Sequence, residues 1–208
     1  MTSETPDNRT WVHEIRTRLE SPVPRELEPE TPGRPASVLV PLYVEAGELW
    51  VVLTKRSEAL ANHAGQYAFP GGRREEVEND WEAAIRETEE EIGIDANRIL
   101  DLGRLDEIYT DVSDFRIVPC VGAVPVPLET TLNEAEIEEV FSVPLLAFAD
   151  VKVIEDRVVE WRGEERQVRV YHIGRRAVWG LTARIIQNLL QRLGVDTAVE
   201  DAPPAPPA

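Results

Sequence analysis

Cysteine, methionine and long hydrophobic runs are nearly absent from this sequence of 208 residues, which has one Cys and one Met. A single thiol cannot form a disulfide within the chain, so we expect Cys120 to be a small buried side chain in an alternating apolar run. No run approaches the ~18 apolar residues of a membrane-spanning helix, and residues 1–10 lack the pattern of a secretory signal. These absences favour a cytoplasmic protein with no membrane partner.

Positive charge is also scarce. The chain has 22 Lys and Arg against 39 Asp and Glu, which gives a net charge of -17. Because proteins bind nucleic acids largely by neutralising phosphates with basic side chains, this balance argues against DNA or RNA as a partner. Small phosphorylated ligands remain compatible with it, since a bound metal ion can invert the local field. Nothing in the pattern indicates an oligomeric state.

The chain divides into a central domain and two peripheral segments. The apolar share of 42% is enough for one packed domain, which we place at residues 36–195. Residues 1–35 are predicted to hold an amphipathic helix, Asn8–Glu20, with apolar residues at fourfold spacing, followed by a proline-rich linker. The proline-rich tail, residues 196–208, is predicted to be disordered.

Short stretches rich in Val and Leu alternate with helical periodicity across the central domain. This mixture predicts an α/β fold, an α/β/α sandwich around a mixed sheet with the N-terminal helix added. The first two and the last two predicted strands are expected to form hairpins. Strands are expected at 37–44, 49–54, 67–70, 99–109, 115–126, 151–161 and 167–172, and helices at 79–92, 134–141 and 179–193.

The predicted helix at 79–92 concentrates acidic side chains. At 100° per residue, Glu87, Glu90 and Glu91 fall within an arc of about 100°, beside the apolar stripe that should face the sheet. Such carboxylates repel one another, and a hard cation such as Mg²⁺ or Mn²⁺ would relieve the repulsion. Arg86 could hold a carboxylate by a bidentate pair. The alternative interpretation is an acidic, solvated helix face.

A wider spacing pattern surrounds these acids. Gly72 is followed after five residues by Glu78, and after seven more by Arg86–Ile94 (RETEEEIGI). The pattern resembles the Nudix box, G-x5-E-x7-R-E-U-x-E-E-x-G-U, with one departure at Thr88, where the box prefers a bulky aliphatic residue. The resemblance implies a Nudix-type fold and hydrolysis of nucleoside diphosphates linked to another group. Because Thr88 should face the core, we expect a small packing cost and unchanged chemistry.

The resemblance also implies roles by position. Carboxylates would hold Mg²⁺ or Mn²⁺, which activates a water to attack one phosphorus. Glu136 is the expected general base, on the helix predicted at 134–141; Glu139 is the second candidate, and either could instead be an ordinary surface acid. Glu78 would brace the carboxylates. The implied metal ligands are Glu87, Glu90, Glu91 and the Gly71 carbonyl, and the implied catalytic residues are Arg86, Glu90, Glu91 and Glu136.

A second resemblance narrows the substrate. Residues 53–57 (LTKRS), continuing through 65–66 (GQ) to 69–72 (FPGG), are similar to the extra motif of coenzyme A pyrophosphatases. This implies coenzyme A or a derivative as the small-molecule substrate, cleaved to 3′,5′-ADP and 4′-phosphopantetheine. Ala61 departs from the motif, which has an arginine there that could reach a phosphate. Lys55, Arg73 and Arg74 are candidates to replace it.

Four residues of this upstream region are candidate substrate contacts: Arg56, Lys55, His63 and Gln66. Arg56 is the first candidate for the 3′-phosphate and Lys55 the second, and strand alternation should bring only one of them into the site. His63 could contact a phosphate or a base, or it could anchor its loop by a hydrogen bond.

Two other functions remain open. The chain could be a Nudix hydrolase of ADP-ribose, NADH or a dinucleoside polyphosphate, which Ala61 allows. It could also be a non-catalytic nucleotide-sensing domain, although a binding module has no need of a full set of ligating acids.

Overall fold

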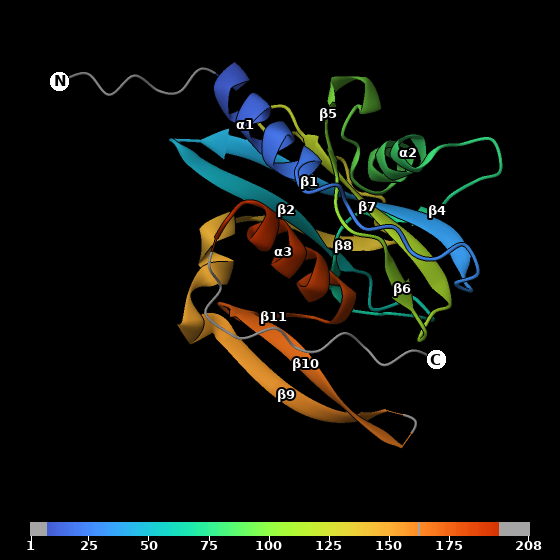
Figure 1. The fold of residues 1–208 in the computed structure, drawn as a ribbon. Helices are drawn as coiled ribbons and strands as arrows, with labels where there is room; N and C mark the ends of the chain where they lie inside the picture. Colours follow the sequence, from blue (N-terminus) through green and yellow to red (C-terminus); the bar gives the residue numbers. More distant parts are fainter. Residues whose placement is uncertain (1–7, 162, 196–208) are drawn as a thin grey trace.

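The computed structural model describes residues 8–161 and 163–195, so the predicted tail at 196–208 lies outside the described residues. A mixed eight-stranded sheet lies between α2 (Asp80–Ile92) on one face and α1 (Asn8–Glu20) with α3 (Gly180–Arg192) on the other (Figure 1). The predicted α/β/α sandwich with an added N-terminal helix is confirmed. Among the described residues, no helix is long and apolar enough to cross a membrane.

Most strands belong to the large sheet, whose main order is β3-β2-β1-β7-β5. β1 runs parallel to β7 and antiparallel to β2, which makes the sheet mixed. A second, three-stranded sheet has the order β11-β10-β9. The strands are β1 (Arg34–Glu45), β2 (Glu48–Arg56), β3 (Tyr67–Ala68), β4 (Gly71–Arg73), β5 (Leu100–Arg104), β6 (Ile108–Thr110), β7 (Phe115–Ala123), β8 (Ile137–Pro144), β9 (Ile154–Trp161), β10 (Glu164–Ile173) and β11 (Arg176–Trp179), with 3-10 turns η1 (Ala96–Arg98), η2 (Leu145–Ala149) and η3 (Val151–Val153).

Alternating apolar side chains of β1 and β2 pack on both faces of the large sheet. Leu39 and Val52 pack in the cluster beneath α2, whereas Val40, Leu42 and Val51 pack in the cluster beneath α1 and α3. All five are fully buried, and burying such a side chain contributes about 1.5–3 kcal/mol. The sheet is therefore covered on both sides, as its near-continuous apolar strands require.

The first predicted hairpin is confirmed. Glu45 of β1 pairs with Glu48 of β2, so the chain reverses over Ala46 and Gly47. Both turn residues have positive φ, 52° and 81°, as a two-residue hairpin turn that matches the strand twist requires. The second hairpin, β9–β10, is also confirmed. It projects from the lower part of the molecule (Figure 1), and Arg166 near its tip forms an ion pair with Asp111 at 2.9 Å.

The helix α1 is packed into the main core. Ile15 and Leu19 are buried in the same cluster as the apolar face of α3. Arg18 Nη1 donates to the Leu193 carbonyl at 2.9 Å, immediately after α3. The predicted bounds of this helix, Asn8–Glu20, are confirmed.

The helix predicted at 134–141 is wrong, because β8 covers most of these residues and pairs antiparallel with β2. Clustered glutamates favoured a helix in the sequence. The β-branched and aromatic side chains of Ile137, Val140 and Phe141 instead lie on a strand whose ladder comes from distant β2, with Phe141 opposite Leu53.

Several other strand bounds also differ from prediction; β9, for example, begins at Ile154, because residues 151–153 form η3. The strand expected at 99–109 is two strands, β5 and β6. The Leu105 amide still donates to Pro119 of β7, but the Glu107 amide donates to the Arg25 carbonyl outside the sheet. The strand expected at 115–126 ends with β7 at Ala123, and the strand expected at 67–70 is reduced to β3.

Candidate metal and catalytic site

The helix α2 is fixed at both ends by local interactions that the sequence predicted. Asn79 accepts a hydrogen bond from the Glu82 amide at 3.0 Å, and the Glu82 carboxylate accepts one from the Asn79 amide at 2.8 Å, which completes the capping box. Gly93 ends the helix with φ 72°. A side chain there would meet the backbone of Thr131 at 2.9 Å, so glycine is required for conformation and for space. The helix therefore presents its acids at a fixed position.

Thr88 faces the core, as predicted, and is completely buried. Its Oγ1 donates to the Ala84 carbonyl at 2.7 Å, so the hydroxyl that replaces an aliphatic group has a hydrogen-bond partner. This local bond keeps the polar group from destabilising the buried stripe.

Arg86 connects several acids beside α2. Its Nε donates to Glu78 at 2.5 Å, its Nη1 contacts Glu87 at 2.9 Å and Glu90 at 3.2 Å, and its Nη2 donates to the Arg73 carbonyl at 3.1 Å. The bond from Arg86 lowers the pKa of Glu78. Arg86 thus orients two carboxylates that α2 presents on one face, while Glu78 orients Arg86.

Glu91 is the most buried acid of this group, with 3% of its surface exposed. Its Oε2 accepts a hydrogen bond from the Gly71 amide at 3.2 Å, and its Oε1 lies 3.6 Å from Arg56 Nη1. Burial raises the pKa of Glu91 to about 7; Glu87 and Glu136 add to the effect, and Gly71 and Arg56 oppose it. The nearby protein groups only partly replace the water that this carboxylate loses.

Glu87 is half-buried, and burial is the main reason that its pKa is raised. Its carboxylate lies against the backbone of Gly72, where an added Cβ would come within 2.5 Å of Glu87 Oε2. The preceding Gly71 has φ 148°, and a Cβ there would meet the Ser37 carbonyl oxygen at 2.4 Å. The paired glycines therefore allow the loop backbone to approach the carboxylates closely.

The two candidates for the general base lie in different places. Glu136 is in the turn before β8, where its charge raises the pKa of Glu87 and Glu91. Glu139 is instead paired with Arg176, away from the α2 acids. Neither candidate is on a helix.

Asn133 belongs to this region and was missed in the sequence. Its amide donates to the Glu91 carbonyl at 2.9 Å, and its Nδ2 lies 3.4 Å from Glu136 Oε1. The sequence did carry a signal for this turn, because an Asn that opens a turn often bonds to the backbone two residues later. In the structure, Asn133 Oδ1 accepts from the Ala135 amide. Asn133 thus links the end of α2 to the turn that carries Glu136.

The two neighbouring cations at the end of β2 have different surroundings. Lys55 Nζ contacts Glu138 at 2.9 Å and Glu58 at 3.2 Å, so surface acids already neutralise it. Arg56 instead reaches toward Glu91. Of the two candidates, the structure brings Arg56 to the α2 carboxylates.

The remaining upstream residues lie in or near the loop between β2 and β4. His63 Nδ1 and Gln66 Oε1 are 3.0 Å apart, and His63 has φ 57°. This contact fits the expectation that His63 anchors its loop. Arg74 is paired with Asp80 at 3.2 Å.

The donor chemistry of the acidic face fits a hard divalent cation. Within residues 8–161 and 163–195, no three His, Cys, Asp or Glu side chains are already gathered as a metal-binding group. Arg86 engages Glu87 and Glu90, and the Gly71 amide engages Glu91. These carboxylates still offer further oxygen lone pairs. Buried Glu91 and half-buried Glu87 are desolvated without full compensation. Carboxylate oxygens are the ligands that Mg²⁺ and Mn²⁺ prefer.

Comparison with known proteins shows relatives by sequence and a solved structure of similar fold. The NUDIX domain model matches residues 33–162. A Photorhabdus laumondii protein described as "Uncharacterized Nudix hydrolase NudL" is 34% identical over 186 residues, covering 89% of this chain and 97% of that protein. A NudL protein from Escherichia coli O7:K1 is 34% identical, covering 78% and 84%. The crystal structure of a MutT/nudix family protein from Enterococcus faecalis is similar in fold, with TM-score 0.52, 19% identity and coverage of 89% and 68%.

Proposed function

Because this chain belongs to the Nudix hydrolase family, whose enzymes cleave pyrophosphate bonds with divalent metals, we propose that it hydrolyses coenzyme A or a derivative with Mg²⁺ or Mn²⁺. The products would be 3′,5′-ADP and 4′-phosphopantetheine or its acylated form. The observation that carries the proposal is the pair of desolvated carboxylates, Glu87 and Glu91, on a helix face braced by Arg86. A solvated surface helix would leave these groups in water.

The α2 acids and the Gly71 loop would hold the metal. When bound, a divalent cation activates a water and offsets charge on the phosphoryl oxygens. Arg86 and Glu78 keep the carboxylates oriented, so that little reorganisation is needed during the reaction. The proposed metal ligands are Glu87, Glu90, Glu91 and the Gly71 carbonyl.

Glu136 is the proposed general base. Its position beside Glu87 and Glu91 supports this role, because a base must lie within reach of the attacking water. Asn133 would orient its carboxylate through the 3.4 Å contact. Glu139 has no such position, since Arg176 holds it.

Arg56 is the proposed contact to a phosphate of the substrate. It lies beside Glu91 at the end of β2, close to where a metal-bound diphosphate would sit. Lys55 and Arg74 are already held by Glu138 and Asp80, which leaves Arg73 as the candidate to replace the motif arginine at Ala61. Gln66 and His63 would shape the loop that covers the substrate.

A second candidate function rests on Ala61. Without the motif arginine, the loop is equally compatible with ADP-ribose, NADH or a dinucleoside polyphosphate, because these share the diphosphate and lack the 3′-phosphate. An A61R variant separates the two functions. It should improve cleavage of coenzyme A if the loop contacts that phosphate, and should leave ADP-ribose cleavage unchanged.

The direct test is product analysis of the full chain with coenzyme A, ADP-ribose, NADH and a dinucleoside polyphosphate, each with Mg²⁺ and with Mn²⁺. We expect 3′,5′-ADP from coenzyme A, with kcat/KM at least about tenfold above the other substrates. R56Q should raise KM for coenzyme A, whereas the matched control K55Q should have little effect. Faster cleavage of ADP-ribose than of coenzyme A would reject the coenzyme A proposal, and inertness on every diphosphate would favour a sensing domain.

A further inference from the structure

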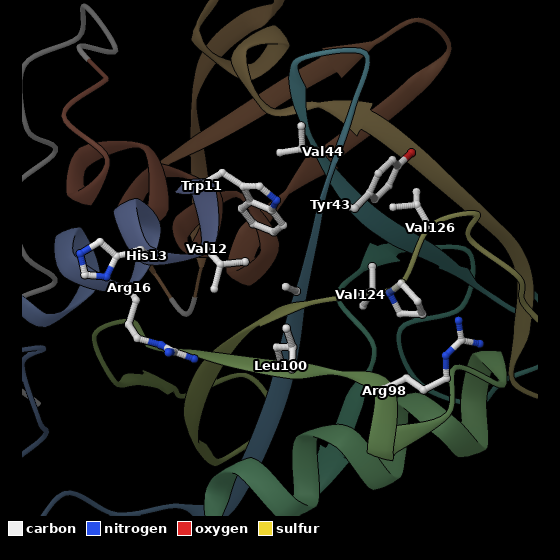
Figure 2. Close-up of a pocket in the computed structure, with 12 residues that line it drawn as sticks. Trp11, Val12, His13, Arg16, Tyr43, Val44, Arg98, Leu100, Val124 and Val126 are labelled. Carbon is white, nitrogen blue, oxygen red and sulfur yellow. The ribbon is translucent and has the colours of Figure 1, made fainter. Parts of the chain in front are cut away.

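A cavity of about 340 Å³ lies between α1 and the nearby ends of β1, β5 and β7, away from the acids of α2 (Figure 2). We call it the α1 pocket. Its walls come from α1, the end of β1, the start of β5 and the segment after β7. None of the proposed metal ligands, catalytic residues or substrate contacts lines it. Its volume falls within the range of small-ligand sites, about 300–1,000 Å³.

Two aromatic side chains and several aliphatic ones form the walls of the α1 pocket. Trp11 projects from α1 on one side, and Tyr43 stands on the opposite side, on β1 (Figure 2). The Tyr43 ring is held in place by stacking on Trp50, with ring centroids 6.2 Å apart and planes at 9°. Leu100 and Val126 also line the pocket and remain 55% and 38% exposed. Because Tyr43 is only 6% exposed, a flat, weakly polar ring would meet mainly Trp11 and the exposed aliphatic side chains.

The charge of the α1 pocket is opposite to that of the whole chain. Arg16, Arg98 and His13 line it, and in the described part of the chain no Asp or Glu does. The full sequence has 39 acidic residues against 22 Lys and Arg. A lining with only basic charge in so acidic a protein favours an anionic ligand.

The two arginines stand on opposite sides of the α1 pocket, Arg16 on α1 and Arg98 at the end of η1 (Figure 2). Arg16 donates to the Asp101 carbonyl, which orients it. A guanidinium has five N–H donors in a planar fork, so this bond leaves others for a phosphate. An anionic group could therefore be bound at one side while a ring fills the apolar part.

We propose that the α1 pocket binds a nucleoside monophosphate, separately from pyrophosphate hydrolysis at α2. The base would pack against Trp11, since stacking of a base on an aromatic side chain contributes about 1–3 kcal/mol. The phosphate would be bound by Arg98 through charge-assisted hydrogen bonds, and Arg16 on the opposite side would add positive charge to the pocket. The ligand would bridge α1 to the strand ends, so binding would stabilise the docking of that helix.

The test is titration of the full chain with AMP by calorimetry in EDTA, so that metal-dependent binding at α2 does not contribute. We expect one AMP site, with adenosine and inorganic phosphate each binding at least fivefold more weakly. R98Q should weaken AMP binding at least fivefold. The matched control R175Q, which changes an exposed arginine outside the pocket, should bind AMP like the wild type. Hydrolysis by R98Q should equal that of the wild type.

The position of the bound AMP is tested separately by NMR of the tryptophan indole groups, with W11F used to assign the Trp11 signal. We expect AMP to shift the Trp11 signal in the wild type and not in R98Q at the same concentration. The proposal is overturned by absence of AMP binding, by equal binding in R98Q, by phosphate binding as tightly as AMP, or by loss of binding in R56Q. Hydrolysis is measured apart from binding, so failure here leaves the proposed function untouched.

Discussion

Two carboxylates with restricted access to water, half-buried Asp106 and buried Glu91, have pKa values shifted in opposite directions. At Asp106, burial disfavours the charge, but the Arg25 amide and the Arg192 guanidinium outweigh burial and lower the pKa. The Arg25 amide donates at 2.9 Å and Asn188 Nδ2 at 3.1 Å, and Arg192 forms an ion pair. Glu91 has the Gly71 amide at 3.2 Å, and its pKa is raised to about 7.

The difference distinguishes a structural acid, Asp106, from the proposed metal ligand Glu91. Asp106 lies just before β6, and its oxygens are bonded to the linker and to α3. Glu91 keeps lone pairs that the protein leaves unbonded, in a place from which water is largely removed. Such incomplete compensation destabilises the fold slightly and is useful where a ligand completes the coordination.

The largest expected effect is loss of catalysis in E91Q. We predict a fall in kcat/KM of at least about 100-fold, because the amide is a poor ligand for a hard cation. The melting temperature should stay the same or rise, since an undercompensated buried charge is removed. The control is E89Q, which changes an exposed acid of the same helix and should retain activity. Equal losses in both variants, or full activity in E91Q, would contradict a role for Glu91 at the metal.

A smaller effect, on stability, is expected for D106N. It should lower the free energy of unfolding by about 2 kcal/mol at pH 7, because it leaves Arg192, whose side chain is 7% exposed, without its ionic partner. Since the folded pKa of Asp106 lies below its ordinary value of about 3.9, this stabilisation is present above that pH and is lost as pH falls through the folded pKa.

Urea denaturation of D106N and the wild type at pH 7 and pH 3 measures this dependence. The control is E26Q, which removes an exposed ion pair to Arg104 and should change stability by less than about 1 kcal/mol. The proposed structural role of Asp106 would be contradicted if the two proteins differed in free energy of unfolding at pH 3 by as much as at pH 7. Reduced kcat/KM for the folded variant would also contradict it.

The smallest effect is expected at Thr88, which lies on the core side of the helix that carries Glu91. T88V should change the free energy of unfolding by no more than about 1 kcal/mol and leave kcat/KM unchanged, because the Ala84 carbonyl keeps its helical bond. T88L, which restores the bulk preferred by the Nudix box, should cost about 1–3 kcal/mol by overpacking. Thermal melts measure the stability of both variants, and initial rates measure their kcat/KM. A T88V variant that is stable but inactive would show that Thr88 takes part in catalysis.

Features set by neighbouring residues were predicted well. The capping box at Asn79 and Glu82, the Gly93 stop and the core-facing stripe of α2 all depend on spacings within one helix. The β1–β2 hairpin likewise depends on a two-residue turn. These features can be predicted from the sequence because residues close together in the chain determine helix ends and tight turns.

Features set by distant partners were not predicted. β8 is a strand because β2 supplies its ladder, so its glutamates lie along a sheet edge instead of on a helix. This changes which acid reaches the site, because Glu136 precedes the strand while Glu139 lies within it beside Arg176. The contact of Arg56 with Glu91 was also not evident, since it joins a strand end to a helix far along the chain.

The contact between α1 and α3 has a consequence for synthesis on the ribosome. Leu19 lies in one core cluster with Leu189, and Arg18 reaches the Leu193 carbonyl, 175 positions later in the chain. At about 5–20 residues per second, α1 would wait on the order of ten seconds or more for these partners to be translated. The apolar stripe of α1 would be open to chaperones during that time, and it would pack fully only after α3 had left the exit tunnel.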